Sequence, residues 1–565
     1  MISSFFAALA LHATLSNAVP LLTRQSNSTR CKVIPGDEGW PSVQTWAQLN
    51  QTVEGRLIAT VPLGSVCHGS SFDQSQCSKM QSEWGFASLV VPQPAEFMST
   101  WFQNNTCTPF SDPSGPCELG NRASYSIDVR SVEDIQAGLA FAKSRNVRLV
   151  VKNSGHDFFG KSTGKGALSL WVNNLKSTTF IPGYKASYYA GPAVRIGAGV
   201  EGGDAATFAS EHGYRVVVGA CPTVKAAGGF TQGGGHSFLT GKYGFGADNV
   251  LEWEAVTADG EHVVATPTNE HADLYWALSG GGGGTYAVVV SMTVRAFPDG
   301  DVALASWSIN VANAGGVDAY WEAVSVYHTH MKSLVDQGFV AEYMVSNESL
   351  DVFGLMAPDH TADSLGSAMA PLLSSLAAVY HDLYAATIGP LMAGNSFAPA
   401  VAGRFLPRAV IEANSTAWHA ALRHATSVGD GRYFASVTTL NSRNPHRVAA
   451  VAANALQPNF ETAFSSLIIS PRWSHTQPWS DAAALVRELE DEVMPVLEQV
   501  TPGAGAYKNE ASWTQKNPQE AFYAGTYPRL ADIKARYDPE GLLYGLTTVG
   551  SERWVSDSEG RLCAA

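Results

Sequence analysis

Three glycine-rich stretches decide how this chain folds: KNSGHDFFGKS at residues 152–162, GACPTVKAAGGFTQGGGHS at residues 219–237 and LSGGGGGTY at residues 278–286. Each stretch lies beside a segment with the composition of a β-strand. Turns of small residues expose consecutive backbone N–H groups that can bind a pyrophosphate. Glycines also let a large flat ligand lie close to the backbone. The three loops together therefore predict a site for a large flat ligand that carries phosphates.

A fourth glycine motif, GAGVEG at residues 197–202, follows a predicted strand and precedes a predicted helix. A dinucleotide-binding fingerprint of this form also needs an acidic residue at the end of the next strand, ~20 residues later. That strand is VVVGAC at residues 216–221, and it contains no acid. We therefore do not expect a nicotinamide dinucleotide here, and we interpret these glycines as a tight turn against bulky neighbours.

The segments around the loops alternate between strand and helix patterns. We expect a β-α-β unit from strands at residues 126–130 and 147–152 and a helix between them, which Ser131 and Asp134 would cap. A second helix should begin at Ser480 and be kinked or shortened by Pro495. Residues 19–117 are polar and predicted to be irregular. Further strands are expected at residues 193–196, 215–218, 251–257, 288–295, 302–309 and 433–440.

The N-terminus has the pattern of a secretory signal peptide. An apolar run from Phe5 to Leu15 precedes small residues at Ser16 and Ala18, which predicts removal of residues 1–18. The alternative, a membrane anchor, needs a run of ~18–20 apolar residues. We therefore expect a secreted or secretory-pathway glycoprotein without a membrane partner. Its candidate N-glycosylation sites are Asn27, Asn50, Asn104, Asn347 and Asn414.

The chain has seven cysteines, and secretion predicts that most of them form disulfides. Cys67 and Cys77 are ten residues apart, as are Cys107 and Cys117, so each pair could close a local loop. Cys31 and Cys563 would then join the two ends of the chain. Cys221, within the second glycine-rich stretch, is the odd cysteine.

Composition excludes several classes of protein. The formal net charge is −14, with no basic block, so we expect no nucleic-acid partner. Hydrophobic residues make up 45% of the 565 residues and charged residues 15%, which excludes a disordered chain. A chain of this length exceeds the ~250–300 residues that one core supports, so we expect two large domains. His328 and His330 would face apart on a helix, and no metal site is predicted.

The glycine-rich stretches resemble the PCMH-type FAD-binding domain of the vanillyl-alcohol-oxidase superfamily, in its berberine-bridge-enzyme-like branch. The resemblance extends through YGFGADNV at residues 243–250 and DLYWAL at residues 273–278. It resumes near the C-terminus with YAGTYPRL at residues 523–530 and YDPEGL at residues 537–542. It covers about residues 120–300 and 507–550, with a looser match between them.

This resemblance implies a two-lobed α+β fold. Residues 19–117 would be an N-terminal extension with disulfides, and residues 118–300 the FAD-binding domain. Residues 301–505 would be an inserted α+β substrate domain, and residues 506–565 a berberine-bridge-like segment that returns to the FAD domain. We expect a monomer.

The resemblance also implies that FAD is attached twice, through His156 to its 8α-methyl group and through Cys221 to its C6 carbon. The odd cysteine count agrees with this assignment. An imidazole and a thiolate on exposed loops are nucleophiles that can add to an electrophilic ring. The further expected FAD contacts are Asn153, Ser154, Gly155, Asp157, Gly160, Gly219, Val224, Gly228, Gly229, Gly234, Gly235, His236 and Asn249.

The predicted activity is that of an FAD-linked oxidase, with a small organic molecule and oxygen as its substrates and hydrogen peroxide as a product. Val224 resembles the permissive form of a gate for oxygen in this family; the alternative is a valine that only packs. Tyr523 and Tyr507 are the expected catalytic residues, or else ordinary core tyrosines. The resemblance implies a secondary-metabolite oxidation or ring closure. The alternatives are a carbohydrate oxidase, or a flavin-bearing binding protein without turnover.

Overall fold

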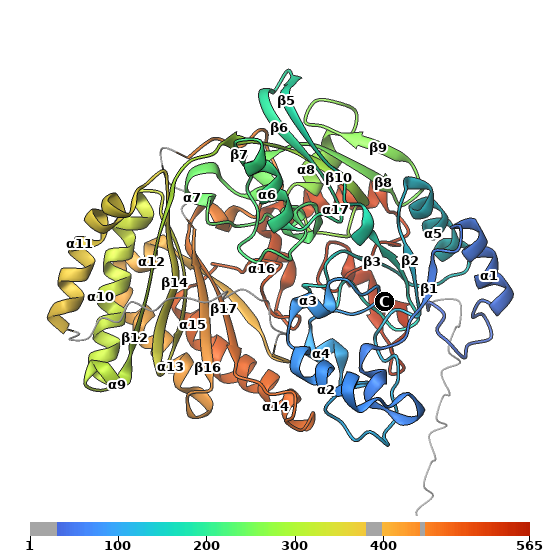
Figure 1. Ribbon diagram of the computed structural model, residues 1–565, viewed down its shortest axis with the longest axis horizontal. Helices are drawn as coiled ribbons and strands as arrows, with labels where there is room; N and C mark the ends of the chain where they lie inside the picture. The colour runs from blue at the N-terminus through green and yellow to red at the C-terminus, as the bar shows by residue number, and fades with distance from the viewer. Residues whose placement is uncertain (1–30, 380–397, 441–443, 445–446) are drawn as a thin grey trace, which may run out of the picture.

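The structure is a computed structural model that describes residues 31–379, 398–440, 444 and 447–565 (Figure 1). The predicted signal peptide (residues 1–18) and the sequon at Asn27 lie outside these residues. The fold is of the predicted α+β class, with three main β-sheets and helices packed around them. Two regions are named here by their residues: the glycine-loop region (residues 118–300 and 506–565) and the six-stranded region (residues 301–505).

The first sheet has four strands in the order β1-β2-β4-β3, of which β1 comes from the N-terminal extension and the other three from the glycine-loop region. The predicted strand–helix–strand unit is present as β2, α5 and β3, but β4 lies between β2 and β3 and is parallel to both. Helix α5 begins with the predicted capping box of Ser131 and Asp134. The elements are β1 (Leu57–Ala59), β2 (Tyr125–Asp128), α5 (Val132–Ser144), β3 (Leu149–Lys152) and β4 (Leu168–Trp171).

The second sheet is antiparallel throughout, with five strands in the order β5-β6-β10-β8-β9. The strand predicted at residues 215–218 is shorter than expected. Only β7 (Tyr214–Arg215) forms, and it pairs with β11 (Phe297–Pro298) in a separate two-stranded sheet. The strand ends there because the chain continues into the loop that carries Cys221. The other elements are β5 (Thr178–Ala186), β6 (Tyr189–Gly197), α6 (Gly202–Glu211), α7 (Thr240–Tyr243), β8 (Val250–Thr257), β9 (His262–Ala265), α8 (Ala272–Leu278) and β10 (Ala287–Arg295).

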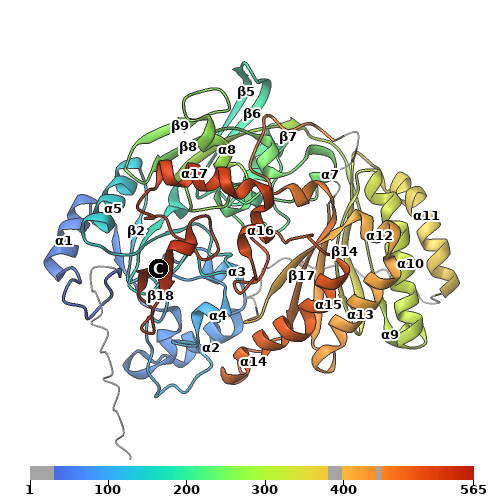
Figure 2. The same ribbon diagram turned by 180° about the vertical axis from the view of Figure 1, so that it is seen from behind.

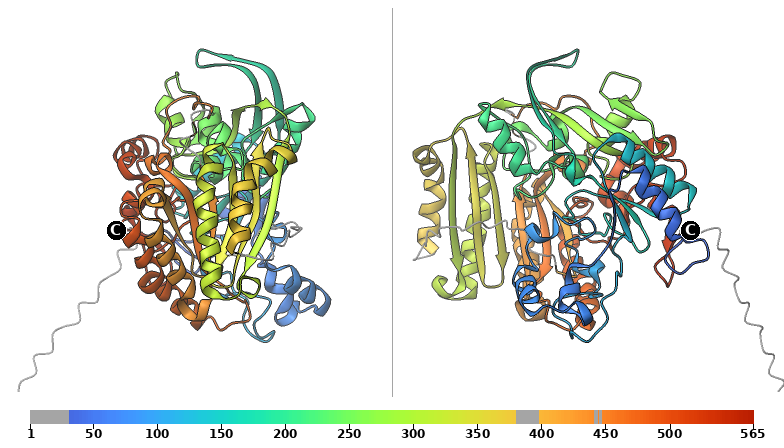
Figure 3. Two further views of the ribbon diagram at one scale, coloured as in Figure 1. Left: turned by 90° about the vertical axis from the view of Figure 1, so that its left-hand side faces the viewer. Right: turned by 45° about the vertical axis from the view of Figure 1, so that its right-hand side comes forward.

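The third sheet belongs to the six-stranded region, and its order is β12-β14-β13-β16-β17-β15, again antiparallel. Helices gather on one side of this sheet, away from the glycine-loop region (Figures 1 and 3). The strands are β12 (Val302–Asn310), β13 (Val340–Ser346), β14 (Ser349–Pro358), β15 (Ala402–Pro407), β16 (Tyr433–Thr439) and β17 (Ala463–Pro471). The helices are α9 (Val311–Ala314), α10 (Val317–Asp336), α11 (Ala362–Val379), α12 (Arg408–Ala413), α13 (Ser415–Gly431), α14 (Ser480–Glu488) and α15 (Met494–Val500).

Strand periodicity gives the third sheet two different faces. On β13, Ala341, Tyr343 and Val345 are buried in the core that the sheet forms with its helices. Successive strand residues point to opposite faces. Glu342, which lies between these core residues, therefore belongs to the face that is turned away from the helices.

The helix predicted from Ser480 is present, and Pro495 interrupts it as expected. Between α14 and α15 the chain makes a π-helical turn at Leu489–Val493, and Pro495 lies in the first turn of α15. Proline has no N–H, and its ring collides with the carbonyl group four residues before it. Regular α-helical hydrogen bonding is therefore interrupted before this residue and resumes in α15.

The N-terminal extension differs from the prediction. Residues 31–117 contain four helices rather than only irregular chain, and α1 buries Trp46 and Leu49 after an N-cap at Ser42. Most of its other residues are polar, which hides the helical periodicity in the sequence. The helices are α1 (Val43–Thr52), α2 (Gln74–Glu83), α3 (Ala87–Val90) and α4 (Thr100–Gln103).

The C-terminal segment (residues 506–565) packs against residues 118–300, with α17 on α8 (Figure 2). It contains α16 (Pro518–Tyr523), α17 (Tyr527–Tyr537), β18 (Trp554–Ser556) and β19 (Leu562–Ala564). Three disulfides are present: the two local pairs that the spacing suggested, Cys67–Cys77 and Cys107–Cys117, and the expected link between the chain ends, Cys31–Cys563. Within the described ranges, no helix combines the length and the apolar character needed to cross a membrane.

Candidate active site

A cavity of ≈ 370 Å³ lies where the glycine-loop region meets the six-stranded region. Most of its wall comes from the loop after β3, the loop before α7 and the glycine run before β10. The six-stranded region contributes Glu342, Ser436 and Ile468, and the C-terminal segment contributes residues 507–510 and 543–545. The predicted residues that line this cavity are Asn153, Ser154, Gly155, His156, Asp157, Gly219, Cys221, Val224, Gly228, Gly229, His236 and Tyr507.

The loop after β3 is held in shape by Asp157. Its carboxylate accepts hydrogen bonds from the backbone N–H of Phe159 at 2.9 Å and from both the N–H and the hydroxyl of Ser162. The side chain of Asn153 donates to the carbonyl oxygen of Ala198, which fastens the loop to the second sheet. These bonds fix the half-buried His156 in the cavity wall.

Cys221 lies outside the three disulfides, in a tight turn at the mouth of the second glycine-rich loop. The N–H of Val224 donates to the carbonyl oxygen of Cys221 at 3.2 Å, with Pro222 at the second position of the turn. The first two residues of α6, Gly202 and Gly203, donate to the carbonyl oxygens of Val224 and Pro222. The glycines of the GAGVEG motif thus support this turn.

His156 and Cys221 meet across the cavity wall, although 65 residues separate them in the sequence. The distance from His156 Nε2 to Cys221 Sγ is 4.0 Å. Burial, together with the positive charges of Lys152 and Lys225, lowers the pKa of His156 to about 4. The imidazole is therefore neutral at physiological pH and keeps a lone pair on one nitrogen.

Buried lysines surround this wall. Burial lowers the pKa of Lys161, which lines the cavity, to about 8, and Asp157 opposes the shift. Burial also lowers the pKa of Lys152 to about 7. Lys225 forms a 2.8 Å ion pair with Glu201. Lys161 thus offers a positive charge inside the cavity.

The opposite part of the wall carries carboxyl groups. Burial raises the pKa of Glu342 to about 7, and His236 counteracts the rise while Glu510 adds to it. His236 Nε2 lies 2.9 Å from a carboxylate oxygen of Glu510. Burial opposes protonation of His236, but attraction to Glu510 outweighs it, so that the pKa of His236 is raised. The described residues therefore place an acid with a near-neutral pKa beside a His–Glu ion pair.

The two predicted catalytic tyrosines lie in different surroundings. The hydroxyl oxygen of Tyr507 accepts hydrogen bonds from Asn509 at 2.8 Å and from the N–H of Gly235 at 3.3 Å, and this residue lines the cavity. Tyr523 does not line it, because its buried hydroxyl donates to the carbonyl oxygen of Thr547 at 3.2 Å. Burial raises the pKa of both Tyr507 and Tyr523, which disfavours the phenolate form.

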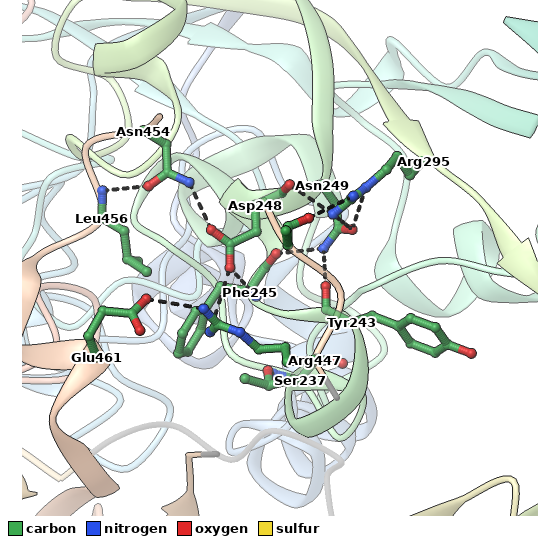
Figure 4. Close-up of polar contacts among 12 residues, drawn as sticks. Ser237, Tyr243, Phe245, Asp248, Asn249, Arg295, Arg447, Asn454, Leu456 and Glu461 are labelled. Atoms are coloured by element: carbon green, nitrogen blue, oxygen red, sulfur yellow. Dashed lines mark hydrogen bonds and ion pairs between the residues drawn. The ribbon is translucent and has the colours of Figure 1, made fainter. Parts of the chain in front are cut away.

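Four other predicted contacts also lie outside the cavity wall: Gly160, Gly234, Gly235 and Asn249. The amide of Asn249 donates to the carbonyl oxygens of Tyr243 and Phe245 and accepts hydrogen bonds from Arg295 (Figure 4). Neighbouring Asp248 bonds to Asn454, so this cluster joins the glycine-loop region to the six-stranded region. Gly160, Gly234 and Gly235 have φ angles of 67°, 124° and 76°, which makes glycine the favoured residue in these loops.

Comparisons with known proteins identify the family. Residues 123–266 match the FAD binding domain family, and residues 506–544 match the berberine and berberine-like family. The chain is 44% identical to a VAO-type flavoprotein oxidase of Thermothelomyces thermophilus, over 98% of both chains. This chain belongs to the berberine-bridge-like branch of the VAO-type FAD-linked oxidoreductases. The predicted family and enzyme class are thereby confirmed.

A second relative in sequence and a solved structure support the same family. The chain is 40% identical to the bifunctional decalin synthase of Penicillium decumbens, over 97% of this chain and 98% of that one. A crystal structure of a VAO-type flavoprotein from Myceliophthora thermophila C1 matches with a TM-score of 0.88 at 43% identity. That match covers 95% of this chain and 100% of the other.

The cavity fits the FAD that this VAO-type family binds. A Cβ added at Gly229 or Gly284 would meet no protein atom within 4 Å, so glycine leaves room there for a ligand against the backbone. Both residues line the cavity, as does Gln232, whose buried Oε1 has no hydrogen-bond partner within the described ranges. The open space at the glycines suits a flat ring system, and the Gln232 oxygen can accept a hydrogen bond from it. The positive charge of Lys161 suits the phosphates. These features match a flat cofactor with phosphates.

Glu342 and Glu510 are the two carboxyl groups of the cavity wall that sequence reasoning missed. Glu342 is the single charged residue in the apolar run FVAEYMV at residues 339–345, and a charge in a buried strand was a usable signal. Glu510 lies three residues after Tyr507 but gave no signal of its own. Its role depends on its contact with His236, which is 274 residues away in the sequence.

Proposed function

We propose that this chain is an oxidase that carries FAD on two covalent bonds, to His156 and Cys221, and oxidises a small organic molecule with dioxygen. The observation that supports this most directly is the 4.0 Å separation of His156 Nε2 and Cys221 Sγ in the cavity wall. The carbon that bears the 8α-methyl group and the C6 carbon are in a 1,3 relationship on one ring of the flavin. An imidazole ring and a thiol that lie this close together can serve both positions.

The remaining wall supports a role in proton transfer. Bound FAD supplies an electron acceptor that takes hydride from the substrate and returns the electrons to dioxygen as hydrogen peroxide. Glu342, with a pKa of about 7, accepts the proton that the substrate loses. The His236–Glu510 pair and the hydroxyl of Tyr507 orient the substrate beside it. Tyr523 is too far into the protein core for that role, so Glu342 takes its place in the proposal.

Val224 lines the cavity next to the turn of Cys221 and is proposed to leave a path for dioxygen. Its side chain is small, and a longer one would extend into the same space. The cavity lining supports a matching domain assignment: residues 118–300 and 506–565 are proposed to hold the cofactor, and residues 301–505 to add Glu342, Ser436 and Ile468 to the wall that faces the substrate.

A small organic molecule of secondary metabolism is the proposed substrate class. The chain is 40% identical over nearly its full length to a protein named bifunctional decalin synthase. We further propose secretion, which the three disulfides support. Asn104 and Asn414 lie at exposed positions where glycans could attach.

Acid precipitation of the purified protein tests the attachment. The wild-type pellet should stay yellow, and digestion should yield one FAD joined to two peptides that contain His156 and Cys221. His156→Ala and Cys221→Ala should each leave a single bond, and the double variant should lose all bound flavin on denaturation. A colourless wild-type pellet would refute covalent attachment.

Peroxide release tests the oxidase assignment separately. Wild-type protein incubated with panels of alcohols, amines and oligosaccharides should form hydrogen peroxide with a member of the first two classes. Turnover of oligosaccharides alone would favour the carbohydrate oxidase. Substrate-dependent turnover only with an artificial acceptor would refute the oxidase and leave a dehydrogenase.

A further inference from the structure

We infer that Thr223 is the positioning residue that prepares both His156 and Cys221 for attachment to FAD. This inference rests on the proposed bicovalent linkage. Thr223 lies two residues after Cys221, in the turn that Val224 N and the carbonyl oxygen of Cys221 close. It acts through the two linking side chains rather than on the cofactor itself.

The hydroxyl of Thr223 contacts both linking groups. Its Oγ1 lies 2.8 Å from His156 Nε2 and 3.5 Å from Cys221 Sγ. The imidazole and the thiol are themselves 4.0 Å apart, so the hydroxyl bridges them. This hydroxyl therefore contacts both loops at the point where the bonds must form.

The position of the hydroxyl is fixed by the backbone. Thr223 occupies the third position of the turn that Val224 N and the carbonyl oxygen of Cys221 close. Gly202 and Gly203 hold the two neighbouring carbonyl groups from the start of α6. The residue is half-buried, so its hydroxyl is placed by the turn rather than by contact with solvent.

One direction of hydrogen bonding leaves both side chains able to react. If Nε2–H of His156 donates to Oγ1, the neutral imidazole carries its lone pair on Nδ1. The hydroxyl proton of Thr223 then points to Cys221 and stabilises the thiolate, which is the reactive form of cysteine. The opposite direction would place protons on Sγ and on Nδ1 and would block both. The low pKa of His156 is consistent with a neutral ring.

The bonds balance as two oxidations. Formation of the Nδ1–C8α bond removes one hydrogen from the methyl group and one proton from the imidazole. Formation of the Sγ–C6 bond removes the ring hydrogen at C6 and the thiol proton. Each bond therefore releases two electrons and two protons, and dioxygen accepts them as hydrogen peroxide. Thr223 is unchanged at the end, as a positioning residue must be.

Attachment measured over time tests this inference. Protein from riboflavin-starved cells is mixed with FAD, samples are denatured, and bonds are assigned by peptide mass. Thr223→Val keeps the shape but removes the hydroxyl, and should slow attachment at least about tenfold. Thr223→Ser restores the hydroxyl and should attach FAD at close to the wild-type rate. Spectroscopy of the flavin peptide should show linkage through Nδ1 in the wild type and a mixture of both nitrogens in Thr223→Val.

The outcomes separate this inference from the proposed function. If wild-type protein gains both bonds and Thr223→Val gains them at the same rate and through the same nitrogen, Thr223 has no such role. If Thr223→Ser is as slow as Thr223→Val, the hydroxyl is likewise not responsible. If the wild type gains no covalent FAD at all, the bicovalent proposal fails and this inference fails with it. Circular dichroism of each variant before FAD is added distinguishes slow attachment from misfolding.

Discussion

The glycine-loop region and the six-stranded region build opposite walls of one cavity by different means. The first uses backbone: loops in which Gly229 and Gly284 leave open space, with Lys161 as a positive charge. The second uses single side chains from neighbouring strands, Glu342 and Ser436 among them. A backbone wall suits a cofactor that all members of a family share. A wall of individual side chains can change from one substrate to another while the fold stays the same.

The largest expected effect is on the side-chain wall. Glu342→Gln should slow flavin reduction by substrate by about 10²–10⁴-fold, because the proton acceptor is lost. Only the carboxylate accepts a proton, so the wild-type rate should rise with pH through a pKa of about 7. Stopped-flow reduction between pH 5 and pH 9, roughly spanning that value, is the measurement. In the Glu342→Gln variant this rise of the rate with pH should be absent, while covalent FAD should still be present.

Exposed Glu348, which pairs with Arg472, offers a matched control. Glu348→Gln should keep both the rate and the pH profile of the wild type. If Glu342→Gln also keeps them, the proton is accepted elsewhere and the division between the two walls is wrong.

The second effect concerns stability. All seven cysteines lie outside the six-stranded region, so disulfides stabilise only the rest of the chain. Removing Cys31–Cys563, whose residues are 532 positions apart, with two serines should lower the free energy of unfolding by about 2–4 kcal/mol. Urea unfolding monitored by circular dichroism gives this difference.

Removing Cys67–Cys77, which closes a loop of ten positions, should cost less in the chain-entropy account. Equal losses from the two removals would show that loop length does not set the stabilisation in this protein.

The third effect is on the backbone wall near Cys221. Val224→Leu adds bulk where dioxygen is proposed to approach, and should slow reoxidation about tenfold, or ~1.4 kcal/mol of barrier. Reduction by substrate should keep its rate, and an artificial electron acceptor should restore turnover. A parallel fall in both half-reactions would mean that the substitution has disturbed the loop instead.

The smallest effect compares one glycine from each region. A Cβ at Gly229 or at Gly366 meets no protein atom within 4 Å, but only Gly229 lines the cavity. Gly366→Ala, on an exposed face of α11, should raise stability by about 0.5–1 kcal/mol. Gly229→Ala should instead lower the share of protein loaded with FAD. Equal FAD loading in both variants would show that the space at Gly229 is not used by the cofactor.

Much of the glycine-loop region could be predicted from the sequence. The loops, the disulfide pairing and the capping box of α5 all depend on residues close together in the chain or on a small set of cysteines. The limits of β7 could not be predicted, because Val216–Val218 have strand-forming side chains but no partner strand beyond β11. Pairing across more than 80 residues overrides the local preference there.

The sequence by itself determined where the backbone must come close to a ligand, since only glycine permits that approach and glycines are visible in any sequence. It also marked His156 and Cys221 as reactive groups on two such loops. The tertiary structure alone decided that these groups meet at 4.0 Å with Thr223 between them, and that Glu342 faces the cavity beside Glu510. The physical reason is that a turn is specified by consecutive residues. A contact between loops or sheet faces depends on how strands far apart in the chain are ordered and registered.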